Sequence, residues 1–405
     1  MAIFRWFGAR LDVRNDRQER LPYMTNVQVP PEAIVSSDRL KRKIIREIMS
    51  QEGWISFARY MECVLYEPLL GYYSGGSVKL GRDGDFVTAP EISPLYGRTM
   101  AQAILPLLEQ TGMRILEFGA GSGKLARDIM DELADAGRRP VQYSILELSG
   151  ELRQRQQQTL AGYEAVRWLT ELPECFDGVM IANEVLDAIP VELVVRRDGS
   201  WHELGVGYED GELVMRERTA GDVLLDAIAC RIPDADRLPE GYVTEIHTRA
   251  YGFVRTLADM LVSGKAGVAV LSDYGFPAHE YYHPDRIRGT LMCHYRHQAH
   301  TDPFYLPGLQ DVTAHVDFTA VAREAKTGGA DVLCYANQAA FLIGAGLIER
   351  LEKEVRDNTG DPVRLRAVQT LLSPAEMGEL FKVMVLGHHV EPPAFMSAID
   401  RSGRL

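Results

Sequence analysis

The segment Met113–Lys124, MRILEFGAGSGK, constrains the fold more than any other part of this chain. Its apolar half, up to Phe118, has the length of a buried strand and is followed by three glycines at alternate positions. The next residues, LARDIMDELADAG, repeat apolar side chains every four positions, which predicts a helix. A glycine turn lets a ligand approach the backbone, and the helix start offers free N–H groups to it. The segment therefore predicts a strand, turn and helix that open a ligand-binding βαβ unit.

Two classes of cofactor site use such a turn. The dinucleotide fingerprint G-x-G-x-x-G would require a glycine at position 124, where this chain has Lys124. The order Glu117, Gly119, Gly121 and Gly123 is instead similar to motif I of class I S-adenosylmethionine (SAM) methyltransferases. On this motif alone, two alternative interpretations of the turn remain, namely a nucleotide site of another kind and a purely structural turn.

Composition excludes several classes of partner. The 405 residues carry a formal net charge of −13, which argues against nucleic acid or an anionic membrane surface as the main partner. The five cysteines are scattered and form no C-x-x-C pair, which indicates a reducing compartment and neither a disulfide framework nor a zinc site. No apolar run reaches the length of a membrane span.

The chain divides into four expected parts. We expect a poorly ordered extension (1–36), an N-terminal helical cap (37–110), a SAM-binding domain (111–390) and a C-terminal tail (391–405). The first twenty residues are rich in arginine but also hold three acidic residues, which does not fit a transit peptide. Met24 is a second candidate start, and Ser37 or Asp38 is the predicted cap of the first helix.

Polar residues stand where two predicted strands end. Val141–Ser149 reads as the second strand of the sheet, with Glu147 near its end, where a carboxylate can accept hydrogen bonds from ribose hydroxyls. Gly178–Ala182 reads as the fourth strand and runs directly into Asn183, Glu184 and, three residues later, Asp187. In an open parallel sheet, ligands bind beyond the carboxyl ends of the strands at the point where strand order reverses. A solvated Glu147 and a helix cap formed by Asn183 are the alternatives.

A proline-punctuated loop precedes the glycine strand. Residues 84–97, GDFVTAPEISPLYG, are too polar for a regular element and stand before a helix that leads into Met113. A loop in this place can fold over the mouth of the glycine turn. The alternative is an ordinary connection in which Ser93 caps the following helix.

Two insertions interrupt the expected sheet. The first spans about 196–245 and contains a β-hairpin around Asp210-Gly211. The second spans 276–317, reads as irregular, and holds six of the ten histidines, three of them in the order His294-x2-His297-x2-His300. Because no cysteine or carboxylate cluster accompanies these histidines at ligand spacing, we expect no metal site.

The chain resembles the MidA family of SAM-dependent methyltransferases. The resemblance covers roughly 39–386 and rests on the motifs LYEPLLGYY, GDFVTAPEISPLYG, ILEFGAGSGKLA, ANEVLDAIPVE, DYGFPAHEYYHPDRIRGTLMCHYRH and DVTAHVDF. It implies an α/β, Rossmann-like class I methyltransferase sheet of seven strands, the seventh antiparallel between the fifth and sixth. It also implies an N-terminal helical region and insertions after strands four and five.

The resemblance implies roles for individual residues. The cofactor, SAM, would be bound by the following residues: Thr88, Pro90, Glu117, Gly119, Gly121, Gly123, Glu147 and Asn183. Of these, Glu117 and the glycines match motif I and Glu147 the ribose ligand. The expected catalytic residues are Glu184, Glu91 and Asp187, with Glu184 and Glu91 holding a cationic acceptor between them.

Mitochondrial members of the resembled family include the arginine methyltransferase that assists assembly of respiratory complex I. We therefore expect a protein arginine N-methyltransferase. By analogy with the resembled family, its protein substrate would be a quinone-reductase subunit. A SAM-binding assembly factor with little turnover and a small-molecule methyltransferase are the alternatives. We expect a cytoplasmic protein if the chain is bacterial and a matrix protein if it is mitochondrial, and we leave a homodimer open.

Overall fold

The computed structural model describes residues 29–75, 88–357 and 362–405 of the chain. Residues 1–28, 76–87 and 358–361 lie outside the described part, and with them most of the predicted extension and the first four residues of the 84–97 loop. None of the helices in the described part is long and apolar enough to cross a membrane.

A seven-stranded path forms the central sheet, in the order β15-β16-β10-β5-β2-β3-β4. The strands are β2 (Arg114–Phe118), β3 (Gln142–Leu146), β4 (Val166–Leu169), β5 (Gly178–Asn183), β10 (Gly267–Phe276), β15 (Asp331–Asn337) and β16 (Phe381–His388). The last strand, β16, runs antiparallel between β10 and β15, as the family resemblance implied. A two-residue strand, β14 (Val316–Asp317), also pairs with the end of β10.

The order of the strands reverses beside the glycine turn. From β2 the chain moves outward through β3 and β4, then returns to place β5 on the other side of β2. All pairs among β2, β3, β4, β5 and β10 are parallel, so their carboxyl ends meet at one edge. That edge, at the switch between β2 and β5, is where ligands of open α/β sheets bind.

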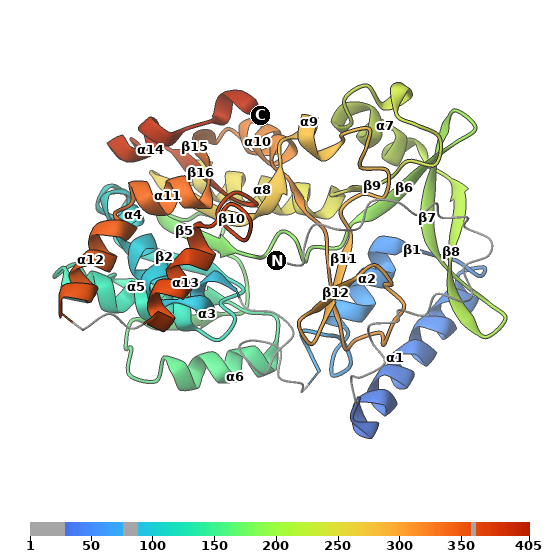
Figure 1. The fold of residues 1–405 in the computed structure, drawn as a ribbon, viewed down its shortest axis with the longest axis horizontal. Coiled ribbons are helices and arrows are strands. Elements are labelled where there is room, and N and C mark those ends of the chain that lie inside the picture. Colours follow the sequence, from blue (N-terminus) through green and yellow to red (C-terminus); the bar gives the residue numbers. More distant parts are fainter. Residues whose placement is uncertain (1–28, 76–87, 358–361) are drawn as a thin grey trace.

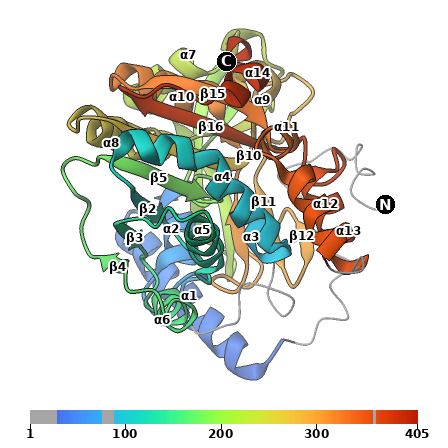
Figure 2. The ribbon, with the colours of Figure 1, turned by 90° about the vertical axis from the view of Figure 1, so that its left-hand side faces the viewer.

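Helices cover both faces of the central sheet (Figure 2). One face packs against α4 (Pro94–Thr111), α5 (Lys124–Asp135) and α11 (Gln338–Gly344) in one hydrophobic core. The other face packs against α8 (Thr248–Val262) and α10 (Phe318–Thr327) in a second core. The remaining helices beside the sheet are α3 (Ala89–Ile92), α6 (Gly150–Thr159), α9 (Ala278–Tyr281), α12 (Leu347–Asp357), α13 (Pro362–Leu372) and α14 (Ala394–Ile399).

A second sheet of five strands lies beside the first, on the right in Figure 1. It consists of β1 (Ile55–Ser56), β6 (Glu192–Arg197), β7 (Ser200–Glu209), β8 (Glu212–Thr219) and β9 (Val243–Ile246), with α7 (Asp222–Arg231) between β8 and β9. The predicted hairpin around Asp210-Gly211 is confirmed as β7 and β8. The N-terminal helices α1 (Pro31–Ser50) and α2 (Phe57–Tyr66) share a core with this sheet. The first two helices of the expected cap therefore share a core with the first insertion, whereas α4, which also falls within 37–110, packs on the central sheet.

Two expectations about local structure were wrong. The first helix begins at Pro31 and not at Ser37 or Asp38, because a proline at the first helical position needs no N–H partner. The second insertion is not irregular throughout, since β11 (Met292–Tyr295), β12 (Gln298–His300) and β13 (Asp311–Thr313) form a small sheet. The tight turn between β11 and β12 places Arg296 and His297 at φ +46° and +62°. Sequence patterns for such turns rely on glycine or asparagine at these positions, so they did not indicate this hairpin.

Candidate active site

The glycine turn after β2 has a backbone that side chains would disturb. Gly119, Gly121 and Gly123 have φ values of +60°, +53° and +83°, all in the left-handed region. A Cβ on Gly119 would lie 3.3 Å from Cγ2 of Val185, which belongs to the turn after β5. The turn therefore presents bare backbone to the switch point, and α5 begins directly after it at Lys124.

Glu147 is held in place at the end of β3. Its Oε1 accepts the backbone N–H of Ser149 at 2.8 Å, and its Oε2 accepts Nε2 of Gln156 at 2.8 Å. The same Nε2 donates to the carbonyl of Gly121 at 3.1 Å, while Oε1 of Gln156 accepts Nε1 of Trp168 at 3.0 Å. Gln156 thus joins the carboxylate to the glycine turn. Sequence reasoning missed it, because the run QRQQQ gives no sign of which glutamine faces inward.

Glu117 lies beneath the turn and not in its mouth. The side chain is 2% exposed, and its Oε2 accepts the hydroxyl of Tyr143 at 2.7 Å. Burial raises the pKa of Glu117 to about 7. From this position Glu117 can act on a ligand only through the backbone above it.

The end of β5 gathers groups from three other elements. Glu184 has φ +54°, and its N–H donates to the carbonyl of Ser272 on β10 at 2.8 Å. Its Oε1 accepts the N–H of Ala89 and Nδ2 of Asn183, both at 3.1 Å. Tyr96 on α4 donates to Oδ1 of Asn183 at 2.6 Å. A non-glycine residue in left-handed backbone is strained, and such strain is found mainly at functional sites.

Two further carboxyl groups lie beside Glu184. Tyr274 donates to Oδ2 of Asp187, whose buried Oδ1 has no hydrogen-bond partner in the described structure. Asp273, on β10, accepts the N–H groups of Val185, Leu186 and Asp187 at 3.1, 2.9 and 3.3 Å. Sequence reasoning did not assign Asp273 to the site. We name Glu184, Asp187 and Asp273 the carboxyl cluster.

Burial and mutual repulsion shift the acidities of the carboxyl cluster. Burial, with repulsion from Asp187, raises the pKa of Glu184 to about 8. Burial raises the pKa of Asp187 to about 6, and burial with repulsion from both neighbours raises the pKa of Asp273 well above its ordinary value. None of the three has a salt bridge to a described lysine, arginine or histidine. A cluster of this kind favours a cationic ligand.

Glu91 does not join the carboxyl cluster. Its carboxylate accepts the hydroxyl of Ser122 and lies 3.3 Å from Nζ of Lys124, so it is bound to the glycine turn. Glu91 and Glu184 make no direct contact with each other among the described residues. Thr88 precedes α3 and makes no capping bond with its side chain, and Pro90 is buried within that short helix. Helix α3 touches the cluster through the backbone of Ala89.

Aromatic side chains from α2 and the following loop form a wall near the carboxyl cluster. The rings of Tyr66 and Tyr73 stack with centroids 5.5 Å apart, and Tyr66 donates to the carbonyl of Ala188 at 2.9 Å. Tyr73 donates to the carboxylate of buried Asp311, at 3.1 Å from Oδ1. Burial raises the pKa of Tyr66, as do the nearby charges of Asp311, Asp187 and Glu147. These tyrosines belong to the LYEPLLGYY motif, but no sequence rule assigned them to the site.

Three of the six histidines of the second insertion, His294, His300 and His315, are buried or half-buried, and the other three are exposed. The ring of His315 stacks on Phe276 at 5.3 Å and meets the ring of Tyr274 edge-on at 4.9 Å. Burial lowers the pKa of His294 and of His300 to about 4. Within the described residues, no group of three or more His, Cys, Asp or Glu side chains could hold a metal ion.

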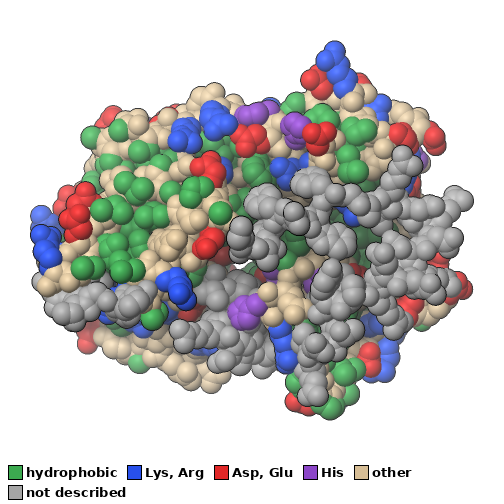
Figure 3. Space-filling view, viewed as in Figure 1, with side chains coloured by type: hydrophobic (Ala, Val, Ile, Leu, Met, Phe, Trp, Pro, Cys, Tyr) green, Lys and Arg blue, Asp and Glu red, His purple; other side chains and the backbone are tan. Residues whose placement is uncertain are grey.

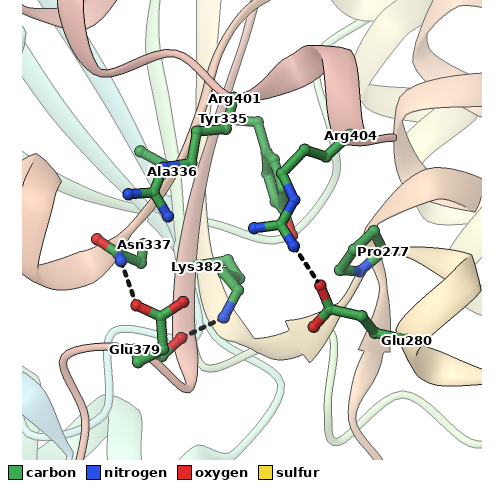
Figure 4. Close-up of a pocket in the computed structure, with 9 residues that line it drawn as sticks. All are labelled: Pro277, Glu280, Tyr335, Ala336, Asn337, Glu379, Lys382, Arg401 and Arg404. Carbon is green, nitrogen blue, oxygen red and sulfur yellow. Dashed lines mark hydrogen bonds and ion pairs between the residues drawn. The ribbon is translucent and has the colours of Figure 1, made fainter. Parts of the chain in front are cut away.

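A separate cavity of about 110 Å³ lies at the other half of the same sheet edge, next to β15 and β16 (Figure 4). Its charged groups largely pair with one another. Arg404 donates to Glu280 at 2.7 Å, Asn337 donates to Glu379, and Nζ of Lys382 donates to the carbonyl of Glu379. Strands β5 and β10 separate this cavity from the glycine turn.

The sheet order, the antiparallel last strand, the left-handed glycine turn and the acidic residue after β3 together define a class I SAM-dependent methyltransferase. The residues fit this cofactor, because the backbone of the turn is accessible at Gly119 and Gly121 and the carboxyl cluster has no cationic side chain of its own. The chain belongs to a family described as S-adenosyl-L-methionine-dependent methyltransferases, whose model matches residues 97–336.

Comparison with solved structures and curated proteins agrees with this assignment. A crystal structure from Burkholderia thailandensis bound to S-adenosyl-homocysteine is 46% identical, with a TM-score of 0.87 over 94% of this chain and 100% of that one. The mitochondrial protein arginine methyltransferase NDUFAF7 of Danio rerio is 27% identical over 86% of this chain and 87% of its own length. The Homo sapiens protein of that name is 27% identical over 83% of this chain and 81% of its own.

Proposed function

We propose that this methyltransferase transfers the methyl group to an arginine side chain of a protein. The observation that carries the proposal is the carboxyl cluster, in which buried Asp187 Oδ1 has no partner among the described residues. A guanidinium keeps its charge at all physiological pH values and donates through a planar fork that fits carboxylates. The names of the relatives from Danio rerio and Homo sapiens support the same acceptor.

In this proposal the glycine turn and Glu147 hold the cofactor, and the carboxyl cluster holds the acceptor. When bound, SAM supplies a methyl group on a positively charged sulfur. Glu184 and Asp187 would orient one guanidinium nitrogen by charge-assisted hydrogen bonds. Alignment of this kind can supply on the order of 7–11 kcal/mol in the most favourable cases. Asp273 would fix the backbone that carries both acids, since it accepts three consecutive N–H groups there.

The proton that leaves the guanidinium needs an acceptor. The pKa of Asp187 is raised to about 6, so its carboxylate is a stronger base near neutral pH than that of an ordinary aspartate. Its free Oδ1 can receive the proton while Tyr274 holds Oδ2. Glu91 would act indirectly, by holding Ser122 and Lys124 at the turn, and Thr88 and Pro90 would place the short helix above it.

The proposal extends to partner and compartment. We take a respiratory quinone-reductase subunit as the acceptor protein, by analogy with the resembled family. The reaction would take place in the cytoplasm of a bacterium or the matrix of a mitochondrion.

We propose one face of the protein as the contact of a homodimer. Hydrophobic side chains gather on the left of the face in Figure 3, over α11 and α14. Ile343 on α11 is 49% exposed, which supports this face as the contact of a homodimer.

Transfer of tritiated methyl from SAM to respiratory-chain proteins, followed by acid hydrolysis, tests the proposal. The expected product is methylarginine. Asp187→Asn and Glu184→Gln should each lower kcat by about a hundredfold or more while SAM binding persists. Asp128→Asn is the matched control, because Asp128 is a buried carboxyl on α5 outside the site. Label in a small molecule only, or no turnover by protein that binds SAM, would overturn the protein-arginine assignment.

A further inference from the structure

Three arginines of α1 form an unpaired stripe. Arg39, Arg42 and Arg46 are exposed and stand three and four residues apart, so they share one face of the helix. None of them has an ion pair with a described acidic residue, although their neighbours do. Lys41 pairs with Glu212, and Lys43 pairs with Glu67.

The stripe borders an open groove of about 710 Å³. Four cationic side chains line one side of it, namely Arg39, Arg42, Lys43 and Arg46. The apolar part of the lining comes from Ile45, Leu70 and Tyr208, which lie on α1, on the loop after α2 and on β7. We name this feature the arginine groove. It combines charge with an apolar floor, as docking sites for peptides do.

The arginine groove is connected to the acceptor side of the active site by one short segment. Leu70 lines the groove, and Tyr73, three residues later, donates to Asp311 in the wall beside the carboxyl cluster. Three residues span at most about 11 Å of extended chain. The segment is tightly folded, because Gly71 N–H donates to the carbonyl of Glu67 at 2.7 Å and a Cβ on Gly71 would lie 2.5 Å from Glu67 N. The groove and the wall beside the carboxyl cluster therefore share one tightly folded segment of the chain.

The charge of the groove contrasts with that of the protein. The whole chain has a formal net charge of −13, so an acidic partner is repelled by most of the surface and attracted to this stripe. The chain's own first 28 residues do not have the complementary charge, since they contain five arginines against three acidic residues. An acidic segment of another protein is the occupant that fits.

We propose that the arginine groove binds an acidic segment of the acceptor protein, with apolar residues among the acids, next to the arginine that is methylated. This inference rests on the proposed function in one respect, namely that the acceptor is a protein. The groove would supply orientation and affinity for the acceptor, while the carboxyl cluster binds the arginine itself.

The test uses the full chain with Arg39, Arg42 and Arg46 all changed to Glu. The control variant carries Arg139→Glu, Arg237→Glu and Arg366→Glu, which make the same change in net charge at exposed positions elsewhere. The probe is a fluorescein-labelled peptide of twelve Glu, Asp and Leu residues, followed by anisotropy. We expect the groove variant to bind it at least tenfold more weakly than the wild type and the control variant, and added salt to weaken wild-type binding.

Activity provides the second measurement. With the acceptor protein, the groove variant should raise KM at least tenfold and leave kcat and SAM binding unchanged. Equal peptide binding by the groove and control variants overturns the groove proposal, as does tighter binding of oligouridylate or anionic vesicles than of the peptide. The wild-type protein can also fail to make methylarginine while the groove variant still loses peptide binding. That result would uphold the groove and refute the proposed acceptor chemistry, so failure of the groove proposal and failure of the proposed function are distinguishable.

Discussion

The carboxylate of Asp273 accepts the backbone N–H of Leu186 at 2.9 Å and so ties β10 to the turn after β5. The same oxygen accepts the N–H groups of Val185 and Asp187. This contact places two members of the carboxyl cluster, Glu184 and Asp187, on a fixed backbone.

Removal of this carboxylate should cost both stability and activity. Asp273→Ala removes the acceptor of four backbone N–H groups, those of Val185, Leu186, Asp187 and Tyr274, and each such group left unsatisfied in a buried place costs about 1–3 kcal/mol. We expect urea unfolding to show a loss of on the order of 3 kcal/mol or more. Asp273→Asn keeps an oxygen acceptor and should lose less than half of that. Equal losses in the two variants would show that the hydrogen bonds are not what stabilises the turn.

Gly119 should be required for cofactor binding for steric reasons. Gly119→Ala places a methyl 3.3 Å from Val185 and gives left-handed backbone to a residue with a Cβ, at about 1–2 kcal/mol. Gly137→Ala is a matched control, because Gly137 has φ +69° and open space around its Cβ position. Both variants should lose similar stability, but calorimetric titration should show loss of SAM binding in Gly119→Ala alone.

Gln156 should act as a positioning residue for the cofactor. Gln156→Ala frees the Glu147 carboxylate from the glycine turn, so we expect the Kd for SAM to rise about tenfold, equivalent to about 1.4 kcal/mol. Gln157→Ala is the control on the exposed side of the same helix. A merely structural role would lower the unfolding temperature and leave the SAM affinity of the folded protein unchanged.

The stability of the ligand-free protein should depend on pH through Glu184. The folded pKa of about 8 lies above the ordinary value of 4.5, so the stabilising form is the protonated one. Its contribution is complete below pH 4.5 and is lost as the pH rises through about 8. The melting temperature should therefore fall across this window, and Glu184→Gln should flatten the decline. An unchanged slope in that variant would assign the effect to other groups.

Several features could be predicted from residues that are close in the chain. The glycine turn, the acid near the end of β3 and the polar end of β5 follow from spacing within single segments. The antiparallel place of β16 came from the resemblance, and the structure confirms it. What could not be predicted involves contacts over long separations, such as Tyr73 with Asp311 or Asp273 with the turn after β5.

The sequence by itself determined where the backbone bends and which strands end in carboxylates, because glycine, periodicity and strand length act locally. Only the tertiary structure decided how these groups combine. It directed Glu91 to Ser122 and Lys124, and it selected Gln156 from a run of glutamines. It also brought Asp273 to the carboxyl cluster. The physical reason is that burial and hydrogen-bond partners depend on which elements pack together, and a linear spacing does not specify that.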